Sequence, residues 1–188
     1  GGGSGSGTLI TEDGWIATAG HVTGPRPGTQ ATVTLADGRI LPGVTYGTHM
    51  AMDYGLVKIE APEGEAFPTA GFGDSDQLIA GQWAVAMGHP LGIEPGRGPV
   101  VRLGRILMPK NERSMITLDA PLIGGDSGGP IFDLGGKVVA INQSISPLSV
   151  EQNIVTPING FQMVFERLMD SETIGQSQSW GTGGGVQP

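Results

Sequence analysis

The stretch IGGDSGGPIF, residues 123–132, sets a single serine, Ser127, among four glycines and a proline. A serine hydroxyl is a weak nucleophile by itself, and it needs an adjacent base to take its proton. The reaction also needs hydrogen-bond donors aimed at the oxyanion that develops in the transition state. Because Gly125 can adopt a backbone conformation that a side chain forbids, the N–H groups of Gly125 and Ser127 can converge on one point. The stretch therefore predicts either a tight turn alone or a nucleophile in an oxyanion-binding turn.

The base for such a serine must come from one of three histidines, His21, His49 and His89. His21 follows ATAG at the end of an apolar run, His49 lies in a polar loop, and His89 lies in GHPLG. A zinc site of three histidines is the alternative, although the three lie in unrelated contexts without short ligand spacing. The chain has no cysteine, which excludes disulfides, thiolate chemistry and cysteine-based zinc sites.

The charge balance disfavours two classes of partner. The net charge is −8 and the pI is near 4.7. Nucleic acids and anionic membrane surfaces both require clustered Lys and Arg, so neither is an expected partner. No apolar run is long enough to span a bilayer, and no signal-peptide pattern precedes Gly1, so membrane insertion is not expected.

The elements that must position these residues are short strands. Asp-Gly pairs at 13–14 and 37–38, and the Gly-Gly pair at 135–136, separate apolar runs and predict hairpins. Turn residues recur every 8–12 residues along the chain, which is typical of barrels and sandwiches. Only residues 159–171 have helical spacing, with Asn159 as the expected N-cap and a core-facing stripe formed by Phe161, Val164, Phe165 and Leu168.

These observations predict an all-β fold of two six-stranded antiparallel β-barrels with a short C-terminal helix. The expected division is an N-terminal barrel over 1–74, a C-terminal barrel over 75–158, the helix over 159–171 and a flexible tail over 172–188. Ser127 then belongs to the second barrel and His21 to the first.

Two short motifs carry a resemblance to a known family. TAGHV at 18–22 and GDSGGP at 125–130 resemble the histidine and serine boxes of chymotrypsin-fold serine proteases. The HtrA (Deg) branch is the closer match, and the resemblance covers about residues 5–165. It rests on segments in the family's order, namely GSGTLITEDGWIATAGHV, VTLADGRILPGVTYG with MDYGLVKIE, GDSDQLIAGQWAVAMGHPLG and LDAPLIGGDSGGPIFDLGGKVVAIN.

The resemblance implies a catalytic triad. His21 matches the general base, Asp53 in MDYGLVKI matches the orienting acid, and Ser127 matches the nucleophile. The oxyanion hole is implied at Gly125, Asp126 and Ser127, and Asp126 is expected to be an exposed turn residue. The implied reaction is peptide-bond hydrolysis through an acyl-enzyme, without a metal or an organic cofactor.

The resemblance also indicates where the side chain before the scissile bond would bind. The expected S1 pocket is formed by Leu122, Ile123, Gln143 and Ile145. The segment holds no acid to pair with Lys or Arg, which favours a medium apolar residue. The alternative is that Leu122 and Ile145 are core residues.

The predicted function is that of an HtrA-like serine endopeptidase that acts on unfolded or extended polypeptides, as in protein quality control. A latent or inactive protease-fold module that binds peptides is the alternative. By resemblance, the expected location is outside the cytoplasm, in a bacterial periplasm or secreted. A homo-oligomer, a trimer in the family, is left open. No PDZ domain is recognised in the chain.

Overall fold

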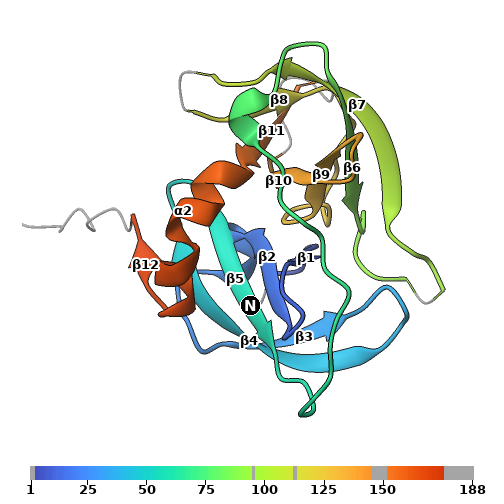
Figure 1. Ribbon diagram of the computed structural model, residues 1–188. Helices are drawn as coiled ribbons and strands as arrows, with labels where there is room; N and C mark the ends of the chain where they lie inside the picture. Colours follow the sequence, from blue (N-terminus) through green and yellow to red (C-terminus); the bar gives the residue numbers. More distant parts are fainter. Residues whose placement is uncertain (1–2, 95, 112–113, 145–151, 176–188) are drawn as a thin grey trace, which may run out of the picture.

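Two β units and one long helix that packs against both make up the chain (Figure 1). The computed structural model describes residues 3–94, 96–111, 114–144 and 152–175. The predicted all-β class is confirmed: within the described residues, the strands outnumber the helices, and the longest helix is near the C-terminal end.

The N-terminal unit is a six-stranded sheet in the order β1-β2-β5-β4-β12, with β3 paired to β4. Its strands are β1 Thr8–Leu9, β2 Trp15–Ala19, β3 Gln30–Thr34, β4 Ile40–His49, β5 Tyr54–Ile59 and β12 Thr173–Ile174. A one-turn helix, α1 Gly20–Thr23, follows β2 directly.

The turns of this sheet form where the Asp-Gly pairs predict them. Gly14 and Gly38 have φ of 99° and 88°, values that favour glycine. The Gly14 N–H donates to the Thr11 carbonyl, and the Gly38 N–H donates to the Leu35 carbonyl. Both hairpins are therefore confirmed.

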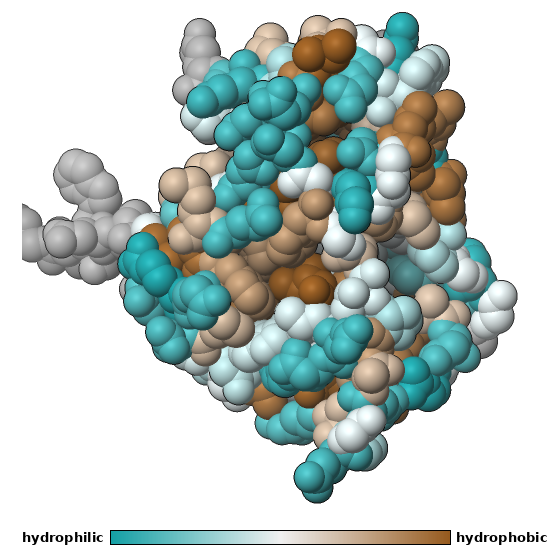
Figure 2. Space-filling model, in the orientation of Figure 1, coloured by the Kyte–Doolittle hydropathy of each residue, from teal (hydrophilic) through white to brown (hydrophobic). Residues whose placement is uncertain are grey.

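The second unit is a closed barrel in the order β10-β11-β8-β7-β6-β9. Its strands are β6 Trp83–Gly88, β7 Val100–Met108, β8 Ile116–Leu118, β9 Pro130–Asp133, β10 Val138–Ser144 and β11 Asn153–Pro157. A 3₁₀ turn, η1 Ser75–Gln77, precedes it. Alternate residues of β7 face opposite ways: Gly104 and Ile106 are buried, whereas Val101 and Leu103 are exposed. Figure 2 shows the resulting apolar patch along the outer edge of the barrel.

The helix α2, Ile158–Met169, ties the two units together. Its stripe is confirmed as core: Phe161 and Leu168 are fully buried, and Val164 and Phe165 pack against the same cluster. That cluster also holds Leu56 of the sheet and Ile141 of the barrel. One shared core therefore fixes the sheet that carries His21 relative to the barrel that carries Ser127.

Three expectations about the elements differ from the structure. The N-cap of α2 is Pro157. The Asn159 side chain instead accepts the Ser75 N–H at 3.0 Å and so ties the helix to η1.

Of the two β units, only the C-terminal one closes into a barrel. The residues expected to begin the tail form β12, which pairs in parallel with Thr48–His49 of β4 because the Thr48 and Met50 N–H groups have acceptors there. Residues 176–188 of the predicted tail lie outside the described residues.

Candidate active site

His21 lies in the single turn of α1, at the end of β2 and facing the start of β5. The turn is held against β5 because the Gly20 N–H donates to the Asp53 carbonyl at 2.9 Å. A Cβ on Gly20 would lie 3.0 Å from the Tyr54 carbonyl oxygen, so this close approach favours glycine. Gly20 of TAGHV therefore provides the backbone contact that places His21 beside Asp53.

Both oxygens of the Asp53 carboxylate contact His21. Its Oδ2 lies 2.7 Å from His21 Nδ1, and its Oδ1 accepts the His21 backbone N–H at 2.7 Å. Asp53 is buried and has a φ of 58°, a left-handed conformation that Asp tolerates better than most residues. The hydrogen bond to Asp53 raises the pKa of His21, and partial burial opposes that rise. The carboxylate thus orients the ring and stabilises its protonated form.

Ser127 lies in a turn packed against the end of β2. Gly128 has a φ of 85°, and a Cβ there would lie 2.1 Å from Thr18 Oγ1 and 2.9 Å from the Ala19 nitrogen. Gly125 has a φ of 100°, and a Cβ there would lie 2.3 Å from the His89 carbonyl oxygen. Glycine is required at both positions. The turn therefore lies directly against the residues that lead into His21.

The peptide groups of this turn leave two N–H groups for an oxyanion. The carbonyls of Gly124 and Asp126 accept the N–H groups of Leu91 and Gly129, at 2.7 Å and 2.9 Å. In a trans peptide the N–H points away from the C=O, so the N–H groups of Gly125 and Ser127 point away from these contacts. Among the described residues, neither of these two N–H groups donates a hydrogen bond.

Asp126 differs from its expectation in two ways. Its N–H donates to the Ile123 carbonyl at 3.1 Å, so it is not free to join Gly125 and Ser127 in an oxyanion hole. Its side chain is buried rather than exposed. Asp126 Oδ2 lies 2.9 Å from Arg102 Nη1 and accepts the Ile123 N–H at 2.9 Å. Burial is possible because Arg102, on β7, supplies the opposite charge.

The Ser127 hydroxyl is not bonded to the imidazole. Its one hydrogen bond among the described residues is a long contact of 3.5 Å to the Gln143 carbonyl. Such a contact is at the outer limit for an O–H donor, so it does little to hold the hydroxyl. The sequence-predicted residues thus fall into two groups: His21 and Asp53 are joined directly, whereas Ser127 is joined to neither.

The residues expected to form the S1 pocket differ in how far they are buried. Leu122 is 3% exposed and packs in the barrel core, which favours the alternative that it is a core residue. Ile123 is exposed and Gln143 is half-buried, so both offer surface beside Ser127. Ile145 lies outside the described residues.

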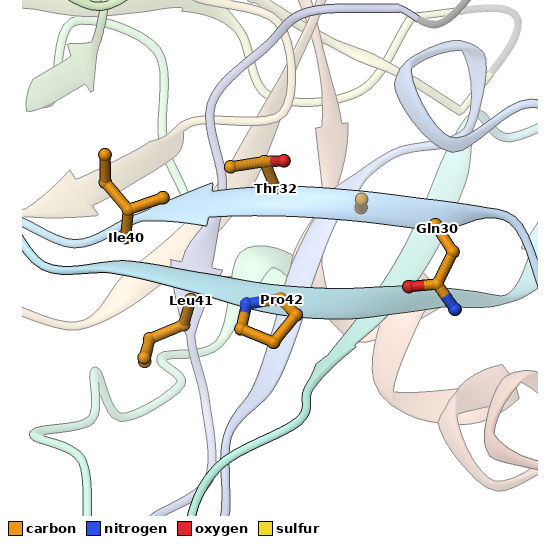
Figure 3. Close-up of a pocket in the computed structure, with 6 residues that line it drawn as sticks. Gln30, Thr32, Ile40, Leu41 and Pro42 are labelled. Carbon is orange, nitrogen blue, oxygen red and sulfur yellow. The ribbon is translucent and has the colours of Figure 1, made fainter.

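One pocket of the described residues lies away from His21, Asp53 and Ser127. A pocket of about 350 Å³ lies on the β3–β4 hairpin (Figure 3). It is lined by Gln30, Ala31, Thr32, Ile40, Leu41 and Pro42, none of which is a predicted site residue. Within the described part of the chain, no group of three His, Asp or Glu side chains is arranged to hold a metal ion. No helix there is long and apolar enough to cross a membrane.

Sequence reasoning missed two residues that contact the turn, Arg102 and Ser6. Arg102 lies between the exposed residues Val101 and Leu103, and no local pattern marks its pairing with Asp126. Ser6 lies in a Gly/Ser stretch whose composition indicates a flexible or edge segment. The only available signal was the resemblance of the GSG triplet to the family's entry segment.

Comparisons with known proteins agree with this geometry. The family model described as a trypsin-like peptidase domain matches residues 5–141. A Synechocystis sp. protein named serine protease HhoB is 34% identical over 172 residues, covering 88% of this chain and 40% of the relative. A Pseudomonas fluorescens protein named as a DegP-like periplasmic serine endoprotease is 40% identical over 143 residues, covering 75% of this chain and 29% of the relative.

A solved structure, that of the HtrA-type protease AlgW with a decapeptide, has the same fold. It has a TM-score of 0.77 and 26% identity, and the match covers 90% of this chain and 53% of AlgW. The chain therefore spans less than half the length of these two curated relatives and about half of AlgW. The chain is similar to DegP-like and HtrA-type proteases. It belongs to the family of trypsin-like peptidase domains.

Proposed function

We propose that this chain is a serine endopeptidase domain that hydrolyses peptide bonds in unfolded or extended polypeptides. Two observations carry the proposal. Both oxygens of the Asp53 carboxylate contact His21, whose side chain is 48% exposed. The Ser127 turn packs against Thr18 and Ala19, which lead into His21, and it has two N–H groups that donate no hydrogen bond among the described residues. The family membership supports the same reaction class.

In this proposal Ser127 is the nucleophile. His21 accepts the hydroxyl proton as Ser127 Oγ attacks the peptide carbonyl, and Asp53 keeps the ring tautomer and stabilises the imidazolium. The N–H groups of Gly125 and Ser127 bind the oxyanion. His21 then protonates the leaving amine. In the second half, His21 removes a proton from water, which attacks the acyl-enzyme. The bond to Ser127 Oγ then breaks, His21 returns the proton to that oxygen, and the new carboxyl end is released. No metal or organic cofactor takes part.

A latent form of the same enzyme is the second candidate. The observation that favours it is the Ser127 hydroxyl, which contacts the Gln143 carbonyl and not His21. A rotation about the Ser127 side-chain bond, driven by bound peptide, would complete the site. Catalytic hydrogen bonds often tighten only when substrate is bound.

Substrate and location follow from the relatives as further proposals. The relatives named as periplasmic endoproteases, and AlgW with its decapeptide, support polypeptide substrates and a location outside the cytoplasm. From the resemblance of the sequence to the HtrA branch, we further propose a role in protein quality control and a homotrimeric assembly. Ile123 and Gln143 are the described residues that we propose to line S1.

Proteolysis of unfolded β-casein by the wild type and Ser127→Ala tests the proposal. The wild type is expected to produce fragments and Ser127→Ala none, with both proteins equally folded by circular dichroism. Fragments that appear only after a short apolar peptide is added would favour the latent form. Equal cleavage by the two proteins would mean that Ser127 is not the nucleophile.

A further inference from the structure

Ser6 joins the N-terminal segment to the Ser127 turn through two hydrogen bonds, and to His89 through a third. Its backbone N–H donates to the Ser127 carbonyl at 2.7 Å. Its hydroxyl donates to the Gly125 carbonyl at 2.8 Å and accepts the His89 N–H at 2.9 Å. Ser6 itself is 9% exposed, so water competes little for these bonds. One residue thus holds two carbonyls of the turn.

These two carbonyls belong to the peptide groups on either side of the Asp126–Ser127 peptide. Four successive carbonyls, from Gly124 to Ser127, each accept a hydrogen bond, and Ser6 supplies the donor for two of them. Rotation of the Gly125–Asp126 peptide turns its own Asp126 N–H directly, and it moves the neighbouring Gly125 and Ser127 N–H groups through the backbone angles of Gly125 and Asp126. Gly125 offers little resistance to such a rotation, because glycine populates many backbone conformations. An external anchor is therefore needed at this carbonyl.

Ser6 is anchored in its turn to the strand that leads to His21. Thr18 Oγ1, which is buried, donates to the Ser6 carbonyl at 2.7 Å. The neighbouring glycines allow this close packing: a Cβ on Gly5 would lie 2.7 Å from the Ser127 carbonyl oxygen. A Cβ on Gly7 would lie 2.6 Å from Ile16 Cγ2. The segment from Gly5 to Gly7 therefore connects β2 to the turn through hydrogen bonds and close packing.

We propose that Ser6 is a positioning residue for the oxyanion hole, acting through the Gly125 and Ser127 carbonyls. The inference rests on the proposed function of Ser127 and adds to it. Among the contacts of the described residues, Ser6 has no hydrogen bond to His21 or Asp53. Loss of its hydroxyl leaves the Gly125 carbonyl and the His89 N–H without partners, which frees the turn to take other conformations.

The test compares Ser6→Ala with Ser4→Ala, an exposed serine in the same Gly/Ser stretch. The readouts are kcat and KM for β-casein and the rate of labelling by a fluorophosphonate across pH. We expect Ser6→Ala to lower kcat and the labelling rate about 10-fold or more, since one lost oxyanion donor costs about 10²–10³-fold. KM and the pH midpoint should not change, because neither ground-state binding nor His21 is altered. Ser4→Ala should match the wild type.

A second readout does not depend on activity. In ¹H–¹⁵N spectra of the folded protein, the amide signals of Gly125 and Ser127 should shift or broaden in Ser6→Ala and not in Ser4→Ala. If Ser6→Ala does not fold, Thr18→Val serves instead, because it removes only the anchor of Ser6. If the fluorophosphonate does not label the wild type, but Ser6→Ala shows these spectral changes, the proposed function is overturned and the anchoring of the turn by Ser6 is not. An active wild type with Ser6→Ala labelled at the same rate would overturn the role of Ser6. A loss confined to KM, or a shifted pH midpoint, would also overturn it.

Discussion

The Asp53 carboxylate fixes both the ring and the backbone of His21, one oxygen to each, at 2.7 Å. A ring held only at Nδ1 could pivot, whereas a residue held at its N–H as well keeps its position along the chain. The left-handed backbone of Asp53 aims the carboxylate at both groups. Orientation of the proposed base is thus built into the contact between α1 and β5.

Replacing Asp53 with Asn should remove most of the activity without unfolding the protein. Asn tolerates a φ near 58° and can still accept the His21 N–H. It no longer stabilises the imidazolium and favours the wrong tautomer, so kcat should fall about 10⁴-fold. Steady-state cleavage of β-casein measures the loss, and thermal unfolding checks the fold. A loss of less than tenfold would mean that Asp53 is not the orienting acid.

The activity should rise with pH through the raised pKa of His21. His21 must be neutral to accept a proton, and its hydrogen bond to Asp53 raises its pKa above 6.5. The midpoint of the fluorophosphonate labelling rate should therefore lie above 6.5 in the wild type and fall in Asp53→Asn. A wild-type midpoint at or below 6.5 would contradict the pairing.

The contact between His21 and Asp53 should make stability fall as pH rises, whereas the activity rises with pH. A histidine whose pKa is raised by folding stabilises the folded state fully below the unfolded pKa of about 6.5. That contribution is lost as pH rises through the raised pKa of folded His21. His21→Ala should therefore destabilise the protein more at acidic than at alkaline pH in denaturant titrations. A difference that grows with pH would contradict this assignment.

The ion pair between Arg102 and Asp126 should matter to stability. Arg102→Met leaves the buried Asp126 carboxylate without its countercharge, at a cost of about 3–5 kcal/mol in the free energy of unfolding. The double variant Arg102→Met/Asp126→Asn removes both charges and should recover much of it. Arg105→Ala is the control, because Arg105 is exposed on the same strand and its pair with Asp119 is worth at most about 1 kcal/mol. Equal effects of Arg102→Met and Arg105→Ala, by urea unfolding, would contradict the claim.

Replacing Gly128 with alanine should lower the free energy of unfolding more than the same replacement at Gly136. Both have a positive φ, so alanine at either costs about 1–2 kcal/mol in backbone strain. A Cβ at 136 meets nothing within 4 Å, whereas a Cβ at 128 would lie 2.1 Å from Thr18 Oγ1. Gly128→Ala should therefore destabilise the protein clearly more than Gly136→Ala, and it should slow labelling of Ser127. Equal unfolding free energies would mean that the turn can move away from β2.

Local signals in the sequence predicted much of the fold, whereas the candidate site residues came from the resemblance to a protease family. The turns at Gly14 and Gly38 depend on neighbouring residues alone, and so does the apolar stripe of α2. The burial of Asp126 depends on Arg102, 24 residues away, and the Gly125 carbonyl depends on Ser6, 119 residues away. Hydrogen bonds at such separations leave no periodic pattern. The pairing of β12 with β4 was missed because β12 has only two residues, which are too few to show an alternating pattern.

Covalent labelling of Ser127 tests the central claim most directly. The wild type is incubated with a fluorophosphonate, with and without a short apolar peptide, and the modified residue is mapped by mass spectrometry. We predict one adduct per chain, on Ser127, absent from Ser127→Ala and strongly reduced in His21→Ala. A wild type that stays unmodified under both conditions, or carries its adduct on another residue, would contradict the account.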